Sequence, residues 1–193
     1  KTSTLPKFCK KINSIDEINN YFTVNLTNRY DRVRVIGDIH GCYTALQQAI
    51  TPWDEKTLYI FCGDYLERGI ENKEMMYEMM RLSTLPNTIM LEGNHERHIA
   101  NFAFHTNLDR SKRFMKDVVA PIVKDMTKKD VESLQRELRL FYKSLRQCYP
   151  FSFHSKKYLV SHGGLSYVPN MAFIPTSTFI NGFGAYETNI ANI

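Results

Sequence analysis

The sequence predicts an α/β fold, and two patterns of residues lead to that prediction. Apolar runs typical of β-strands alternate with stretches that carry apolar residues at helical spacing. Four of the apolar runs are followed at once by a short polar motif that contains glycine or histidine. A strand, a turn and a helix in this order form the unit of α/β proteins, in which ligand-binding side chains lie at the carboxyl ends of parallel strands.

The four predicted strands and their motifs come in chain order. Val33–Ile36 precedes Gly37-Asp38-Ile39-His40-Gly41, and Leu58–Cys62 precedes Gly63-Asp64-Tyr65-Leu66-Glu67-Arg68-Gly69. Thr88–Leu91 precedes Gly93-Asn94-His95-Glu96, and Tyr158–Ser161 precedes His162-Gly163-Gly164. We expect all four motifs to meet at one edge of the predicted sheet.

Two helices are predicted between the strands, over Tyr43–Ile50 and Asn72–Leu82. The second contains a stripe of methionines, which we interpret as core packing rather than as a binding surface. These methionines are Met75, Met76, Met79 and Met80.

The segment before the first strand is polar and basic. Ser14 is placed to cap a short helix over Ile15–Phe22. We interpret residues 1–32 as a linker or edge element and residues 33–193 as the domain itself.

Residues 101–147 show a purely helical pattern, with one apolar stripe at steps of three and four residues. The stripe consists of Leu134, Leu138, Phe141, Tyr142 and Leu145. We expect a helical insertion between the third and fourth motifs. At that position it would stand over the carboxyl ends of the strands and could act as a lid or a substrate-reading subdomain.

The polar residues of the motifs are of the types that bind metal ions. Each of them alone is more often a turn former or a loop histidine. Together, carboxylates, imidazoles and an amide oxygen form a set of O and N ligands that suits Mn²⁺, Fe²⁺ or Zn²⁺ better than Ca²⁺. Asp64 is the natural bridging ligand, because two neighbouring cations need an anion between them. The pattern therefore indicates a two-metal phosphoesterase.

At these motifs the sequence resembles the calcineurin-like metallophosphoesterases, in particular the phosphoprotein-phosphatase branch, which reads GDxHG, GDxxDRG and GNHE. The resemblance extends from about Val33 to Tyr167. It implies a metallophosphoesterase β-sandwich flanked by helices, with an inserted helical subdomain. It also implies two divalent metal ions, with manganese expected and iron, zinc or nickel as alternatives.

The resemblance further implies a role for each site residue. Asp38 and His40 would hold the first metal, Asp64 would bridge, and Asn94 and His162 would hold the second. A water or hydroxide between the metals would attack the phosphorus in line. His95 would be the general acid, and Arg68, with Asn94, would contact the phosphoryl oxygens. These residues are quoted from the printed sequence.

The sequence departs from the family pattern in two places. Glu67 stands where the family has an aspartate that orients the catalytic histidine, so the turn or the histidine must shift to keep that hydrogen bond. The family also supplies a further histidine to the second metal from a later strand, whereas no histidine follows His162 here and the chain begins with Lys1. We interpret the chain as a piece of a longer phosphatase, truncated at its C-terminus; the alternative is a natural protein with a depleted second site.

Composition sets modest bounds on the function. The 193 residues are 43% hydrophobic, enough for one ordinary core, and no apolar run approaches the roughly 20 residues that span a bilayer. No signal peptide is recognisable. Because the four cysteines show neither paired nor zinc-type spacing, we expect reduced thiols and a cytoplasmic location, without a membrane partner.

Positive charge is concentrated in the predicted insertion. Residues 110–146 hold eleven lysines and arginines against five acids, a net charge of +6 compared with +5 for the whole chain. A charged helix face is often only solvated surface. Beside a phosphate-cleaving site, however, it favours polyanionic substrates such as RNA or DNA ends.

The C-terminal segment from Ile174 to Glu187 resembles the corresponding region of the phosphatase module in bacterial and phage polynucleotide kinase-phosphatases. The chain has no Gly-rich P-loop, so any kinase or repair domain would be fused to it or associated with it.

We therefore expect an enzyme that hydrolyses phosphomonoesters, or 2′,3′-cyclic phosphates, on nucleic-acid ends. The alternatives are a Ser/Thr or Tyr phosphoprotein phosphatase, a dinucleoside polyphosphate hydrolase and an inactive binding fragment.

Overall fold

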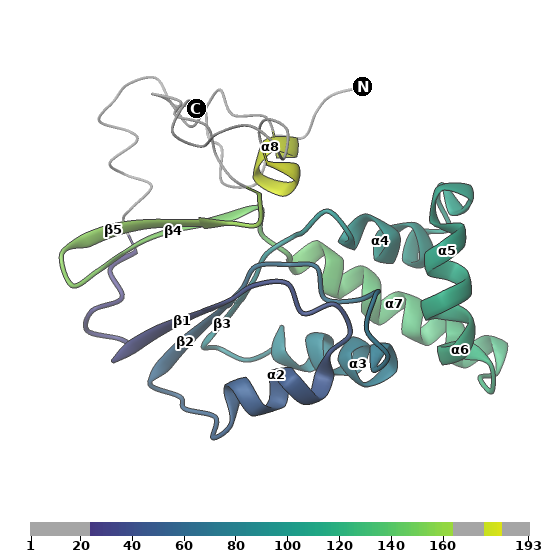
Figure 1. Cartoon of the computed structure of the whole chain (residues 1–193), viewed down its shortest axis with the longest axis horizontal. Helices are drawn as coiled ribbons and strands as arrows, with labels where there is room; N and C mark the ends of the chain where they lie inside the picture. The colour runs from purple at the N-terminus through teal and green to yellow at the C-terminus, as the bar shows by residue number, and fades with distance from the viewer. Residues whose placement is uncertain (1–23, 164–175, 183–193) are drawn as a thin grey trace.

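The computed structural model describes residues 24–163 and 176–182. The predicted helix over Ile15–Phe22 lies outside the described residues, as does most of the C-terminal segment. The α/β fold predicted from the sequence is confirmed. Two sheets and a set of helices lie in layers (Figure 1).

The first sheet contains three parallel strands in the order β1-β2-β3. These are β1 (Arg32–Ile36), β2 (Thr57–Phe61) and β3 (Thr88–Met90). Val33 pairs with Leu58, and Ile60 pairs with Ile89, so the strands begin and end close to their predicted positions. Their carboxyl ends therefore lie side by side, as the pattern of the motifs requires.

The second sheet is a hairpin of β4 (Cys148–Phe153) and β5 (Lys156–Ser161), and it corrects part of the prediction. The strand before His162 is predicted to join the parallel sheet, but within residues 24–163 and 176–182 β5 pairs with β4 alone, in antiparallel orientation. The sequence pattern predicts no strand over the residues of β4. Pro150 lies inside that strand, and proline within an apolar run normally argues against a central strand.

The central strand β2 is buried on both faces, and its alternate residues belong to two cores. Leu58 and Ile60 pack against Tyr149 and Phe151 of the hairpin, in a cluster that also contains Leu26. Each such buried aliphatic side chain contributes about 1.5–3 kcal/mol relative to an exposed one. The hairpin is thus the second layer of a β-sandwich.

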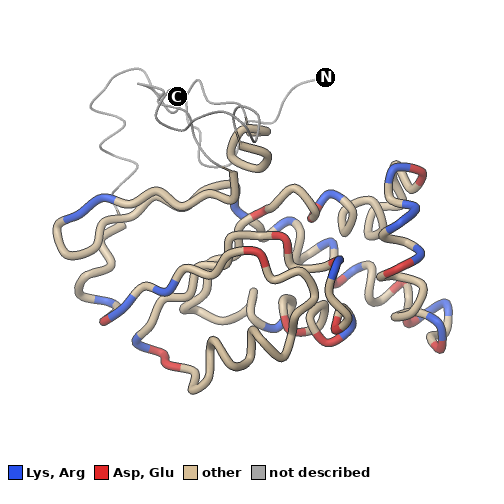
Figure 2. The backbone as a smooth tube through the Cα atoms, in the orientation of Figure 1, with Lys and Arg blue, Asp and Glu red and all other residues tan. Residues whose placement is uncertain are grey.

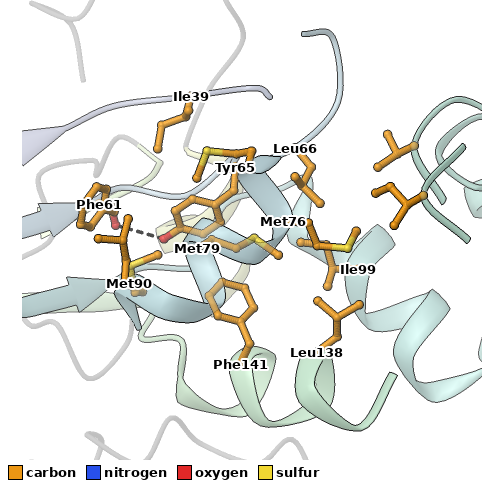
Figure 3. Packing of buried hydrophobic residues seen from close by; sticks show 14 of the residues in the cluster. Ile39, Phe61, Tyr65, Leu66, Met76, Met79, Met90, Ile99, Leu138 and Phe141 are labelled. Carbon is orange, nitrogen blue, oxygen red and sulfur yellow. Dashed lines mark hydrogen bonds between the residues drawn. The ribbon is translucent and has the colours of Figure 1, made fainter. Parts of the chain in front are cut away.

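The opposite face of β2 packs against helices. Tyr59 and Phe61 lie in the larger cluster, and the hydroxyl of Tyr65 donates to the carbonyl of Phe61 at 3.3 Å (Figure 3). The helices α2 (Tyr43–Ile50) and α3 (Asn72–Leu82) cover this face (Figure 1). Met75, Met76 and Met79 of α3 are buried and Met80 is partly buried, so the methionine stripe is core, as predicted.

Residues 101–147, predicted to be a helical insertion, are mostly helical in the structure. α4 (Glu96–Phe104) begins before this range, and it is followed by η1 (Leu108–Ser111), α5 (Lys112–Phe114), a π-helical turn η2 (Met115–Val119), α6 (Ala120–Val123) and α7 (Lys128–Ser144). Thr127 and Asp130 form a capping box at the start of α7. The described range 101–147 contains no strand, only an isolated bridge between Leu91 and Arg146.

This insertion shares the main core instead of building one of its own. Leu134, Leu138 and Phe141 of the predicted stripe are buried in the same cluster as Met76 and Tyr65. Figure 3 shows Leu138 and Phe141 in this cluster. The side chain of Arg139 donates to the carbonyl of Ala103 at 2.6 Å and thereby ties α7 to α4. The helices are therefore fixed beside α3, and α4 begins at the third motif.

Candidate metal centre

The turns behind β1 and β2 are joined by backbone hydrogen bonds. The amides of Ile39 and His40 both donate to the carbonyl of Asp64, at 3.2 and 2.9 Å. The turn behind β3 approaches the same point so closely that a Cβ on Gly93 would lie 2.3 Å from Asp64 Oδ1. Only glycine fits there, and the three turns form one packed unit.

Asp64 lies between two histidines and is 3% exposed. Its Oδ2 is 3.6 Å from His40 Nε2, and its Oδ1 is 3.6 Å from His162 Nε2. The two oxygens of one carboxylate therefore face two different imidazoles. This is the arrangement expected of a carboxylate that bridges two cations.

The other predicted ligands lie around the same carboxylate. Asp38 is about equally far from both histidines, with Oδ2 3.9 Å from His40 Nε2 and Oδ1 3.8 Å from His162 Nδ1. Asn94 Oδ1 is 3.0 Å from His162 Nε2. The structure thus brings together all five residues that the sequence analysis selected as metal ligands, although Asp38 is not closer to its predicted partner His40 than to His162.

The outer sides of both histidines are held by backbone carbonyls. His40 Nδ1 lies 3.1 Å from the carbonyl oxygen of Leu66, and His162 Nδ1 lies 3.0 Å from that of Cys62. A carbonyl can only accept, so Nδ1 of His40 donates and its Nε2 carries the lone pair. Among the described residues this buried Nε2 has no hydrogen-bond partner. A buried nitrogen lone pair directed at carboxylates fits a metal ion better than any other occupant.

A second group, made of His95, Glu67 and Arg68, lies next to the candidate ligands. The Nδ1 of His95 donates to the carboxylate of Glu67, and its backbone amide donates to Asp64 Oδ1 at 3.0 Å. Arg68 Nη2 is 3.2 Å from His95 Nε2, on the exposed side. Glu67 therefore reaches His95 despite being longer than the aspartate of the family pattern.

Several of these residues have left-handed backbone conformations. The φ angles are 47° for His40, 53° for Asp64, 74° for Glu67 and 63° for Arg68. Non-glycine residues in this region cost on the order of 1–3 kcal/mol each and persist only where surrounding contacts impose them. Here Asn72 supplies two such contacts, since it accepts from the Glu67 amide at 2.8 Å and donates to the Gly69 carbonyl at 2.7 Å.

Glu96 is a further positioning residue, to which the sequence analysis assigned no role. Its carboxylate is fully buried and accepts the backbone amides of Gly93, Asp64 and Tyr65, at 2.7, 2.8 and 3.0 Å. Burial raises the pKa of Glu96 to about 7, against the opposing effect of these hydrogen bonds. The carboxylate ties the second turn to the third. Its position in the third motif was the one sequence feature that pointed to a role for Glu96. The fold shows from which backbone amides its carboxylate accepts hydrogen bonds.

Comparison with known proteins decides the family. The model of the family described as calcineurin-like phosphoesterase matches residues 31–190. The chain belongs to this family. A relative, serine/threonine-protein phosphatase 2 of Salmonella typhimurium, is 32% identical over 149 residues, which are 76% of this chain and 64% of the relative. The symmetrical bis(5′-nucleosyl)-tetraphosphatase of Baumannia cicadellinicola is 32% identical over 136 residues, which are 68% of this chain and 41% of that protein.

Solved structures of similar proteins include a putative diadenosine tetraphosphatase, with a TM-score of 0.45, 22% identity and coverage of 74% of this chain and 54% of that one. A protein serine/threonine phosphatase from Saccharomyces cerevisiae gives a TM-score of 0.48 at 22% identity, with 79% of this chain and 46% of that one covered. The chain, a member of the calcineurin-like phosphoesterases, thus spans less than two thirds of the length of these two relatives. Over the described residues, none of its helices has the length and apolar character needed to cross a bilayer.

Proposed function

We propose that the protein is a two-metal phosphomonoesterase. The observation that carries the proposal is the position of Asp64, whose two carboxylate oxygens lie 3.6 Å from the Nε2 atoms of His40 and His162. Asp38 and His40 would hold one cation, Asn94 and His162 the other, and Asp64 both. The carboxylate, imidazole and amide ligands suit Mn²⁺ first, with Fe²⁺, Zn²⁺ and Ni²⁺ as alternatives. When bound, such a pair of cations offsets charge on a phosphoryl group and activates water.

His95 is the proposed general acid. Its Nδ1 is held by Glu67, so the ring is oriented with Nε2 toward Arg68 and the ligand cluster. Because a guanidinium only donates, Nε2 accepts from Arg68 in the free site. Once Arg68 binds the phosphoryl group instead, a proton taken up on Nε2 can be donated to the leaving oxygen of a phosphate ester. The guanidinium of Arg68, next to this nitrogen, offers planar donors that match phosphoryl oxygens.

We further propose that the substrate is a phosphorylated nucleic-acid end, on the basis of charge near the site (Figure 2). Ser111 Oγ is 2.9 Å from His98 Nδ1, and the His98 and His95 rings are 6.1 Å apart, so η1 lies close to the proposed acid. Residues 109–117 of this part carry four basic and two acidic side chains. Two of the basic side chains form exposed ion pairs, Lys112 with Asp109 at 3.1 Å and Arg113 with Asp117 at 3.5 Å, which solvent screens and a polyanion can replace.

Not all positive charge of the insertion supports this proposal. Lys128 and Lys129 begin α7, whereas Tyr142, near the other end, donates to Glu92 beside the third motif at 2.6 Å. At 1.5 Å per residue this is a separation of about 20 Å along the helix. The guanidinium of Arg139 donates a hydrogen bond to the carbonyl of Ala103. The basic residues near η1, and not these three, are therefore the candidates for contact with substrate.

A phosphoprotein phosphatase is the second candidate, and the Salmonella relative favours it. The Baumannia relative likewise keeps a dinucleoside polyphosphate substrate open. The experiment is to incubate the chain with Mn²⁺ and four substrates side by side. These are an oligonucleotide 3′-phosphate, an oligonucleotide 2′,3′-cyclic phosphate, a serine phosphopeptide and diadenosine tetraphosphate.

Two charge variants sharpen this comparison. Arg110→Gln/Lys112→Gln/Arg113→Gln should raise KM for the oligonucleotide and reduce its salt dependence, by about 0.7–0.9 in log–log slope for each lost phosphate contact. Lys128→Gln/Lys129→Gln is the matched control and should change neither. If only the phosphopeptide turns over, the nucleic-acid proposal is wrong. If no phosphate ester at all is hydrolysed, including p-nitrophenyl phosphate, the chain is an inactive binding fragment.

A further inference from the structure

A third group of ligand-type atoms lies beside the proposed metal centre. Glu67, His95 and His98 each contribute an atom, and these atoms all lie within 4.8 Å of one another. His95 and His98 are three residues apart at the start of α4, so their side chains share one face of its first turn. All three residues are partly exposed, so that solution ions can reach them.

His98 is oriented by contacts on its outer side. Its Nδ1 is 2.9 Å from Ser111 Oγ, which also accepts from Asn101 Nδ2 at 2.9 Å. Its ring stacks on Phe114, with centroids 5.8 Å apart and an angle of 22° between the planes. The exposed Arg97 donates to His98 Nε2 at 3.4 Å, which identifies Nε2 as the nitrogen with the lone pair.

The chemistry of this group is that of zinc. Two imidazoles and one carboxylate, with a fourth position open to solvent, form a ligand set that zinc adopts with distances near 2.0–2.2 Å. The nitrogen donors disfavour Mg²⁺ and Ca²⁺. Glu67 and His98 each offer one ligand atom to this group. Glu67 is also the residue at which this chain departs from the family motif. Its extra methylene extends the carboxylate beyond the reach of an aspartate.

We propose that Glu67, His95 and His98 form an inhibitory zinc site. Zinc binding would replace the proton on His95 Nδ1, which passes to solvent, and would take the carboxylate of Glu67 from the histidine. His95 then keeps a proton on Nε2, but zinc and no longer Glu67 holds the ring, so this proton is displaced from the position in which it can be donated to a leaving group. The inhibitory effect rests on the proposed phosphatase activity, whereas zinc binding itself does not.

Zinc binding is tested first without any activity measurement. The chain, His98→Gln and His98→Phe are dialysed to equilibrium against the same micromolar concentration of Zn²⁺, and zinc per chain is measured. The wild type should hold about one zinc ion more than either variant. His98→Phe keeps a ring against Phe114, so at least one variant retains the packing of the insertion. Equal zinc content in all three proteins overturns the proposal. His154→Gln, in the exposed turn of the hairpin, is the matched control and should bind zinc like the wild type.

Inhibition is tested second, with p-nitrophenyl phosphate and excess Mn²⁺. The Zn²⁺ concentration for half inhibition should rise at least about tenfold in both His98 variants, since loss of even an outer contact to a metal ligand costs 10–100-fold in affinity. Activity without zinc should stay unchanged. Equal inhibition of all proteins, relieved by more Mn²⁺, would show displacement at the main centre and would contradict the inference. If the wild type is inactive, the proposed function fails, but the dialysis result still decides the zinc site.

Discussion

The carboxylate of Glu67 accepts a hydrogen bond from Nδ1 of His95 across the gap between the second and third turns. Glu67 has a left-handed backbone, with φ at 74°, which Asn72 fixes through the Glu67 amide. The glutamate therefore reaches His95 although it is one methylene longer than the aspartate of the family motif.

His95→Ala is predicted to lower kcat for alkyl phosphates by roughly 10²–10⁴, the usual contribution of a positioned acid. p-Nitrophenyl phosphate should be affected less, because its leaving group needs little protonation. The measurement is kcat for both substrates in Mn²⁺. His154→Ala on the exposed hairpin turn is the control. An equal loss on both substrates would show that His95 orients ligands and does not donate a proton.

Glu67→Asp is predicted to weaken the dyad, although it restores the family's residue. Because the turn is fixed by Asn72, the shorter side chain withdraws the carboxylate by about one C–C bond, or ~1.5 Å. A misplacement of this size can cost up to about 10²-fold. The kcat for alkyl phosphates should fall while KM stays close to wild type. Activity at or above wild type would mean that the turn adapts freely.

Glu96→Gln is predicted to destabilise the fold by about 1–3 kcal/mol, because its –NH₂ group would face a backbone amide where the carboxylate accepts one. For a chain of this size that corresponds to a fall in Tm of roughly 2–4 °C per kcal/mol. Thermal unfolding of the metal-free protein measures the effect. Glu74→Gln, exposed on α3, should leave Tm unchanged. A wild-type Tm for Glu96→Gln would contradict the role given to these three amide contacts.

The pH dependence of stability should depend on Glu78. Its carboxylate accepts from Arg81 at 2.7 and 2.8 Å and from Gln47 of α2 at 2.8 Å, and these contacts, Arg81 first, lower its pKa. A lowered folded-state pKa gives stability that is present above the unfolded-state pKa and is lost as pH falls through the folded-state value. The free energy of unfolding of Glu78→Gln should therefore fall less steeply below about pH 4.5 than that of the wild type. Parallel curves would contradict the assignment.

The parallel strands, the methionine core and the helical character of the insertion were all predictable from the sequence. Their signals are local, since periodicity and glycine-flanked turns report on neighbouring residues. The candidate ligands could be selected for a related reason: Asp38, His40 and Asp64 stand directly behind strands whose ends must meet.

The rest depended on contacts between distant segments. The hairpin strand β4 was not predicted because it contains Pro150, a residue that argues against a strand. Without β4 as its partner, β5 could not be assigned to a second sheet. The importance of Glu96 depends on which backbone amides come within reach once three turns pack together. Arg139 counts toward the positive charge of residues 110–146, but the fold commits this side chain to a carbonyl of α4.

The bridging role of Asp64 is tested most directly by counting metal ions in Asp64→Asn. Asparagine tolerates the left-handed backbone found here and can still accept the His95 amide at Oδ1, so the fold should persist. An amide cannot offset the charge of two divalent ions. Equilibrium dialysis in Mn²⁺ should give about two ions per chain for the wild type and no more than about one for the variant, with hydrolysis of p-nitrophenyl phosphate lost. Two bound ions and wild-type turnover in Asp64→Asn would contradict the two-metal centre.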